Sequence, residues 1–179
     1  MPRPMKHWQI MTKARQPRIL LIGTGDTKAD ELIFMSNWIR EAGGEPIMMD
    51  VSVLGDPPYQ PHHDKHAVAR AAQTTIDQIA ASGDENSAMS LMALGATRLT
   101  RTLCDAGEID GMIAIGGTMG TDLALDVALV LPIGVPKFVA PGPDNPMGSR
   151  ALYLYSGGKD TLFRIHGTNQ PEYIGASIS

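Results

Sequence analysis

Cysteine, aromatic residues and long apolar runs are all scarce in this sequence. Cys104 is its single cysteine, so no disulfide can form within the chain. Cys104 follows Leu99 and Leu103 on an apolar helical stripe, a pattern typical of a buried structural thiol. Aromatic residues make up only 5% of the chain, whereas 43% is hydrophobic and 11 residues are methionine. We therefore expect an aliphatic core that is rich in methionine.

Signals for membranes, export and polyanions are also missing. No stretch reaches the roughly 20 consecutive apolar residues of a membrane-spanning helix. The basic first 17 residues lack the apolar run of about 7–15 residues that a secretion signal requires. The formal net charge of −4 favours neither nucleic acid nor an anionic membrane as a partner. We expect a cytoplasmic protein with a disordered basic tail over residues 1–17, and the sequence leaves a homo-oligomer open.

From residue 18 onward, short apolar runs alternate with longer segments of helical spacing. The apolar runs predict strands over Arg18–Ile22, up to about Asp50, within "DGMIAI" and within "VPKFVA". Helical spacing predicts helices over about 28–42, 65–82 and 86–106, and again after "GGTMGT". Strands that alternate with helices indicate an α/β fold with a parallel sheet.

The character of the sequence changes near Ala140. The last 40 residues show no helical period and contain two short β-like runs, Ala151–Tyr155 and Thr161–Ile165. The segment "SGGKD" between them is typical of a turn. The sequence therefore predicts an α/β domain over residues 18–139, followed by a short β-rich segment over residues 140–179.

Two glycine turns join a predicted strand to a predicted helix. They are "GTGDTK" at Gly23–Lys28 and "GGTMGT" at Gly116–Thr121. Free backbone N–H groups and the helix dipole favour an anion at such a junction. The carboxyl ends of parallel strands lie at one edge of the sheet, so both turns could face one crevice. Neither turn is a complete dinucleotide or P-loop fingerprint, and simple turn chemistry remains an equal alternative.

The candidate ligand-binding residues belong to these two turns and to the end of the second strand. They are Gly23, Thr24, Gly25, Asp26, Thr27, Lys28, Asp50, Gly116, Gly117, Thr118, Gly120 and Thr121. The threonines offer hydroxyl donors and the lysine offers a positive charge. Asp26 would repel phosphate unless it caps the helix or meets a metal. Asp50 is suited either to hold a ribose hydroxyl or to cap a turn.

Several motifs resemble a widespread, mostly uncharacterised family between about Arg18 and Phe138. They are "IGTGDTKADEL", "MDVSVLG", "ALGATRL", "GEIDGMIAIGGTMGTDLAL" and "LPIGVPKF". The family includes the N-terminal domain of a plant tobamovirus-resistance protein, an inhibitor of viral RNA replication, and is described as ATP-binding. The resemblance implies a Rossmann-like domain, incomplete here, with ATP, either alone or with Mg²⁺, at the two glycine turns.

Three histidines, His62, His63 and His66, lie in and just after a loop rich in proline. No cysteine and no tight histidine spacing supports a metal site there. We therefore expect a solvated loop rather than a metal centre.

The final residues resemble a different family, the L,D-transpeptidases, which cross-link bacterial peptidoglycan. Those enzymes use a cysteine thiolate that a histidine activates. In "DTLFRIHGTNQPEYIGASIS", His166 matches the catalytic histidine, and Gly167, Thr168 and Asn169 match its flanking loop. The matching cysteine would fall just beyond Ser179. If this segment is an enzyme, the resemblance implies an acyltransferase of this type, inactive as written.

Two functional hypotheses follow from the sequence. The first is an ATP-binding α/β domain fused to a transpeptidase fragment. The alternative is a member of the peptidoglycan L,D-transpeptidases that lacks its nucleophile.

Overall fold

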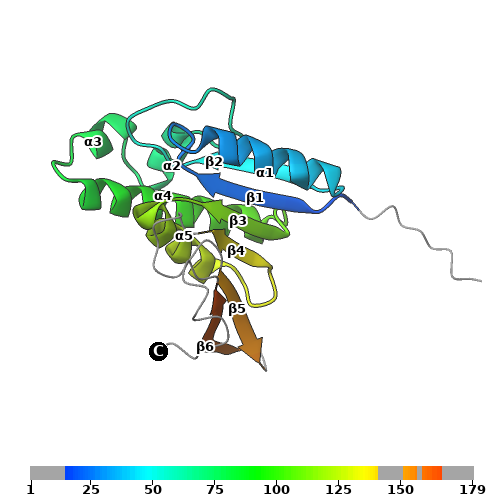
Figure 1. Cartoon of the computed structure of the whole chain (residues 1–179). Coiled ribbons are helices and arrows are strands. Elements are labelled where there is room, and N and C mark those ends of the chain that lie inside the picture. Colours follow the sequence, from blue (N-terminus) through cyan, green and yellow to red (C-terminus); the bar gives the residue numbers. More distant parts are fainter. Residues whose placement is uncertain (1–14, 141–150, 157–158, 167–179) are drawn as a thin grey trace, which may run out of the picture.

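A parallel sheet with helices on both faces forms the body of the protein (Figure 1). The computed structural model describes residues 15–140, 151–156 and 159–166. The parallel strands have the order β2-β1-β3-β4 and are β1 (Arg18–Gly23), β2 (Glu45–Asp50), β3 (Gly111–Ile115) and β4 (Lys137–Ala140). Beyond β4, the antiparallel strands β5 (Ala151–Ser156) and β6 (Lys159–His166) extend the sheet. The predicted α/β fold is confirmed.

The helices divide unequally between the two faces of the sheet. One face carries α1 (Ala29–Glu41), whose Leu32 and Ile39 pack against Leu21 of β1. The other face carries α2 (Lys65–Ala71), α3 (Ile76–Ala80), α4 (Glu85–Asp105) and α5 (Thr118–Val130). Side chains alternate along a strand, so the neighbours Leu20 and Ile22 point to this second face. Both faces of the sheet are therefore covered, as parallel sheets require.

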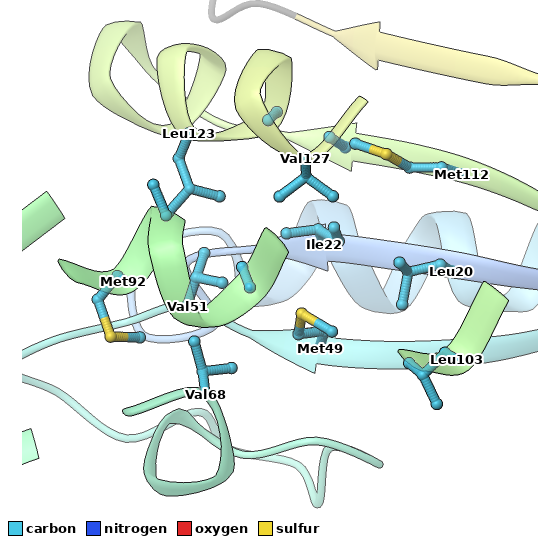
Figure 2. Packing of buried hydrophobic residues seen from close by; sticks show 14 of the residues in the cluster. Leu20, Ile22, Met49, Val51, Val68, Met92, Leu103, Met112, Leu123 and Val127 are labelled. Atoms are coloured by element: carbon cyan, nitrogen blue, oxygen red, sulfur yellow. The ribbon is translucent and has the colours of Figure 1, made fainter. Parts of the chain in front are cut away.

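The larger core lies between the sheet and the helices α2, α4 and α5 (Figure 2). Met49, Met92 and Met112 are each at most 2% exposed and fill this space beside aliphatic residues. This confirms the predicted aliphatic, methionine-rich core. Cys104 packs against the edge of the same core and is partly buried rather than fully buried.

The strand order reverses direction once, between β1 and β3. From β1 the chain passes over α1 to β2 on one side. It then returns past β1 to β3 and continues to β4 on the other side. Crossover connections between parallel strands are right-handed, so connections that run toward opposite edges of the sheet place their helices on opposite faces. This matches the position of α1 on one face and of α5 on the other. Such a reversal opens a crevice at the carboxyl ends of the two strands, where ligands bind in open α/β sheets.

The helix predicted over residues 65–82 is wrong, because two short helices stand in its place. Gln73, between α2 and α3, has φ 64°, which a continuous helix cannot contain. Thr75 then caps α3, with its side chain bound to the Gln78 N–H and the Gln78 side chain bound to the Thr75 N–H. The sequence signal was present as a Thr-x-x-Gln capping box, but the helical spacing of the apolar residues continued through it.

The histidine loop pairs with the edge of the sheet, and within it His62 is exposed while His63 is partly buried. His63 donates its N–H to the Met48 carbonyl at 3.0 Å and accepts from the Asp50 N–H at 2.8 Å. His62 Nδ1 accepts from the Met48 N–H at 3.0 Å. The loop therefore pairs with backbone groups on the outer edge of β2, which would otherwise be open. His66 is exposed on α2. Among the described residues, no group of three or more His, Cys, Asp or Glu side chains could hold a metal ion.

Burial of His63 makes the stability of this loop sensitive to pH. Desolvation, together with the neighbouring His62, lowers the pKa of His63 below its usual value of 6.5. The unfolded chain then binds more protons than the folded protein just below this pH, so the free energy of unfolding falls as the solution is acidified. We expect His63→Gln to flatten the decline between about pH 7 and pH 5.5. Urea denaturation of both proteins across this range is the measurement, and equal slopes would contradict the prediction.

Part of the predicted basic tail is bound to the sheet. The Arg15 guanidinium binds the Asp110 carboxylate at 2.8 Å, and the Pro17 carbonyl accepts from the Glu45 N–H at 2.7 Å. The remainder of the predicted tail, residues 1–14, lies outside the described residues. Within the described part of the chain, no helix has both the length and the apolar character needed to cross a membrane.

Candidate functional site

A cavity of about 820 Å³ lies at the carboxyl ends of β1, β2 and β3. The first glycine turn contributes Thr24, Asp26 and Thr27, and the second contributes Gly117 and Gly120. Its volume is within the range of about 300–1,000 Å³ that small-molecule sites occupy. The two turns follow β1 and β3, the strands between which the strand order reverses. Residues of both turns line this one cavity, as the sequence suggested they could.

The first turn is tight because its backbone folds back on Thr24. The Thr24 carbonyl accepts from the N–H groups of Thr27 at 3.2 Å and Lys28 at 2.8 Å. The hydroxyls of Thr24 and Thr27 lie 2.8 Å apart and both line the cavity. Gly23 precedes the turn, where an added Cβ would lie only 2.7 Å from the Ile115 carbonyl oxygen of β3. Gly23 therefore serves the close approach of β1 to β3 and does not line the cavity.

Asp50 caps the first glycine turn from the end of β2. It is 1% exposed, and its Oδ1 accepts from the N–H groups of Gly25 at 2.9 Å and Ser52 at 3.0 Å. The Ser52 hydroxyl also donates to this oxygen. Of the two roles that the sequence left open, the structure shows turn capping. Asp50 Oδ2 is buried and has no hydrogen-bond partner among the described residues.

Asp26 holds a neighbouring loop in place. Its Oδ1 lies 3.0 Å from the Ser52 hydroxyl, and its Oδ2 accepts from the Gly55 N–H at 3.1 Å. Asp26 does not cap α1, which has no side-chain cap. The aspartate therefore fixes residues 52–55 while its negative charge remains in the cavity lining.

Tyr59 lies behind the first turn and was not among the predicted residues. An added Cβ on Gly25 would lie 2.7 Å from the Tyr59 hydroxyl, which shows how closely the two pack. Burial and the carboxylates of Asp50 and Asp26 raise the pKa of Tyr59 to about 12, so the phenol stays neutral. The only signal in the sequence was its position, nine residues after Asp50, as the one tyrosine that precedes the C-terminal segment.

The second turn presents bare backbone to the cavity. Gly117 is the N-cap of α5 and makes no side-chain capping bond, and no described residue lies within 4 Å of a Cβ added at Gly117 or Gly120. Gly116, in contrast, packs against Gly120, whose Cα would lie 2.8 Å from an added Cβ. The buried Thr121 donates its hydroxyl to the Gly117 carbonyl at 2.9 Å. Thr118 begins α5, and its side chain lies outside the described part.

Lys28 does not line the cavity. At the N-cap of α1, its ammonium binds the Glu31 carboxylate at 2.9 Å. This hydrogen bond is the main reason that the pKa of Glu31 is lowered. The positive charge predicted for the site is therefore neutralised on the surface of α1.

A third part of the lining was missed by the sequence analysis. It comes from α3 and from the start of α4, with Ala80, Asp84, Glu85 and Met89. Asp84 caps α4 by accepting from the Ser87 N–H at 2.8 Å, and hydrogen bonds from Ser87 lower the pKa of Asp84. The described lining thus carries three carboxylates, with Asp26, and no lysine, arginine or histidine.

A comparison with known families assigns the chain. Residues 17–162 match the N-terminal domain of a protein family described as uncharacterised, UPF0261. The chain belongs to the UPF0261 family. The resemblance found in the sequence motifs is therefore confirmed at the level of family.

Several proteins share this UPF0261 region. A UPF0261 protein of Brucella suis biovar 1 is 64% identical over 123 residues, which cover 69% of this chain and 29% of that protein. A UPF0261 protein of Clostridium tetani is 32% identical over 143 residues, which cover 80% of this chain and 34% of that protein. The ToMV resistance protein Tm-1 of Solanum lycopersicum is 26% identical over 144 residues, which cover 71% of this chain and 19% of that protein. The chain spans about a third or less of the length of these relatives.

The C-terminal motif of this UPF0261 chain lies mostly outside the described residues. His166 is the last residue of β6, and residues 167–179 are not described. The UPF0261 match continues past Ala140, through β5 and into β6. The resemblance to L,D-transpeptidases and the domain division near Ala140 both stay predictions from the sequence.

Proposed function

We propose that the cavity binds a nucleotide, with ATP as the leading candidate. One observation carries the proposal: the two glycine turns after β1 and β3 line a single cavity at the reversal of strand order. This is the position at which open α/β sheets bind nucleotides. The sequence resemblance to a family described as ATP-binding points to the same ligand.

The N-terminus of α5 lies at the cavity and suits the phosphate groups. Neither α1 nor α5 has a side-chain cap. The first N–H groups of a helix have no partner within it, and with the helix dipole they favour an anion. At α5 these groups lie beside Gly117 and Gly120, where a Cβ added at either glycine would meet none of the described residues within 4 Å. The hydroxyls of Thr24 and Thr27 add donors from the other turn.

The carboxylates in the lining favour a nucleotide that arrives with a cation. Asp26, Asp84 and Glu85 would repel a free triphosphate, and Lys28 is already bound to Glu31. Mg²⁺ binds through one or two carboxylates together with substrate phosphates. We therefore propose the Mg²⁺ complex of ATP as the bound form. Asp26 is the carboxylate that the glycine turns would offer to the cation.

Filling the cavity at Gly120 should weaken this binding without unfolding the protein. Among the described residues, an added Cβ at Gly120 meets nothing within 4 Å, so Gly120→Leu places its side chain at the cavity without a clash with them. Saturation of the wild type at ~100 Kd of Mg–ATP should raise the free energy of unfolding by about 2.7 kcal/mol. We expect Gly120→Leu to weaken binding by at least about tenfold, a loss of about 1.4 kcal/mol. Isothermal titration with Mg–ATP measures the affinity, and denaturation with and without Mg–ATP measures the stabilisation. Titration with ATP plus EDTA tests whether binding depends on Mg²⁺.

The matched control is Thr102→Leu, an exposed position near the opposite end of α4. It introduces the same side chain on a helix outside the cavity lining. Equal affinities for Mg–ATP in the wild type and both variants would place the ligand elsewhere. Absence of binding to the wild type would refute the proposed function.

A further inference from the structure

Leu54 is the most exposed large apolar side chain of the described residues, yet its backbone is held firmly. Its side chain lines the cavity, and the residue is 84% exposed. On one side, Asp26 Oδ2 accepts from the Gly55 N–H at 3.1 Å. On the other side, Lys65 Nζ donates to the Gly55 carbonyl at 2.8 Å and the Leu54 carbonyl at 3.4 Å.

Lys65 is the less usual of these two anchors. It is 7% exposed, although lysine is rarely buried, and it forms an ion pair with Asp56 at 2.8 Å. The Lys65 ammonium thus binds the Leu54 and Gly55 carbonyls and the Asp56 carboxylate, all in the loop that carries Leu54. A loop that is fixed at both its N–H and carbonyl groups presents the leucine in a constant position. The exposure of Leu54 therefore does not come from a loosely attached loop.

The rest of the apolar lining lies in the same cavity. Val53 comes from the same loop, and Ala80, Ala88 and Met89 come from α3 and α4. Methionine adapts its shape and makes favourable contacts between its sulfur and aromatic rings. The glycine turns, together with Ser52, Asp84 and Glu85, make up the polar part of the cavity, and this set contributes to its apolar part, so the lining suits a ligand with both characters.

We infer that Leu54 and Met89 form the subsite for the planar base of the nucleotide. This inference rests on the proposed function, because it divides the same cavity between the phosphates and the base. The phosphates lie at the glycine turns, and the base covers Leu54. The ligand class is then a nucleotide recognised through its ring as well as its phosphates, rather than any polyphosphate.

The test compares Mg–ATP with Mg–tripolyphosphate, which has the same chain of phosphates and no nucleoside. Each is titrated by calorimetry into the wild type, Leu54→Ala and Leu129→Ala. Leu129 is the matched control, because it is 81% exposed on α5 and does not line the cavity. Both leucines are exposed, so equal melting temperatures are expected for all three proteins.

We expect Leu54→Ala to weaken Mg–ATP binding about tenfold, as covering a leucine side chain implies, and to leave tripolyphosphate binding unchanged. Leu129→Ala should change neither. Equal effects of Leu54→Ala on the two ligands, or no effect on either, would overturn the base subsite and leave the proposed nucleotide site intact. Failure of the wild type to bind either ligand would refute the proposed function, and the base subsite with it.

Discussion

Gly95→Ala is expected to destabilise the protein by about 1–3 kcal/mol, the cost of overpacking a tightly packed interior. Within a helix the same change normally stabilises, by up to about 1 kcal/mol. Gly95 lies in α4, where an added Cβ would overlap the carbonyl oxygen of Val68 and lie 2.9 Å from its carbonyl carbon. The obstacle is the backbone of α2, which cannot rotate away as a side chain can. The methyl group must therefore push α2 away from α4.

Gly120→Ala provides the matched control for this prediction. Gly120 also lies within a helix, but an added Cβ there would have no neighbour within 4 Å in the described part of the chain. We expect it to raise the free energy of unfolding by about 0.5–1 kcal/mol, because alanine loses less backbone entropy on folding. Urea denaturation of both variants should give changes of opposite sign. A stabilising Gly95→Ala would show that α2 and α4 do not pack as described.

Asp50→Ala is expected to cost about 3 kcal/mol of stability and to weaken nucleotide binding as well. The carboxylate accepts hydrogen bonds from Gly25 and Ser52 in a position that is 1% exposed. Removing it leaves buried donors without an acceptor, at about 1–3 kcal/mol for each. It also releases the first glycine turn, so the hydroxyls of Thr24 and Thr27 lose their fixed position. Thermal denaturation and titration with Mg–ATP measure the two effects.

The control is Asp105→Ala at the end of α4. Asp105 pairs with Arg101 on the surface, where both side chains are more than half exposed, at 64% and 61%. Such pairs contribute less than about 1 kcal/mol. Similar small losses for Asp50→Ala and Asp105→Ala would show that Asp50 does not hold the turn.

The local elements of this protein could be predicted because their causes are local. Gly43, with φ 84°, follows the predicted end of α1 and accommodates the left-handed turn there. The apolar run Arg18–Ile22 predicted β1, and the apolar period after it predicted α1, which the structure places at Ala29–Glu41. The one wrong helix arose where a capping box at Thr75 interrupted an apolar period that otherwise continued.

Among the candidate residues, the sequence by itself located the two junctions between a strand and a helix, although α5 already begins at Thr118, within the second predicted turn. Glycine spacing depends on the chain within a few residues, so both turns and their threonines could be found in this way. Only the tertiary structure decided what each residue does there. Gly23 and Gly116 serve close packing, Asp50 caps a turn, Lys28 pairs with Glu31, and Gly117 and Gly120 remain open to the cavity.

The remaining features depend on contacts between residues far apart in the sequence. The strand order β2-β1-β3-β4 brings the two glycine turns together, although more than 80 residues separate them. The packing of α4 brings Asp84 and Met89 to the same cavity as Leu54. Periodicity shows which side of an element is buried, but it does not show which other element covers that side. The sequence therefore determined the elements and their turns, and the packing of the sheet and helices determined the site.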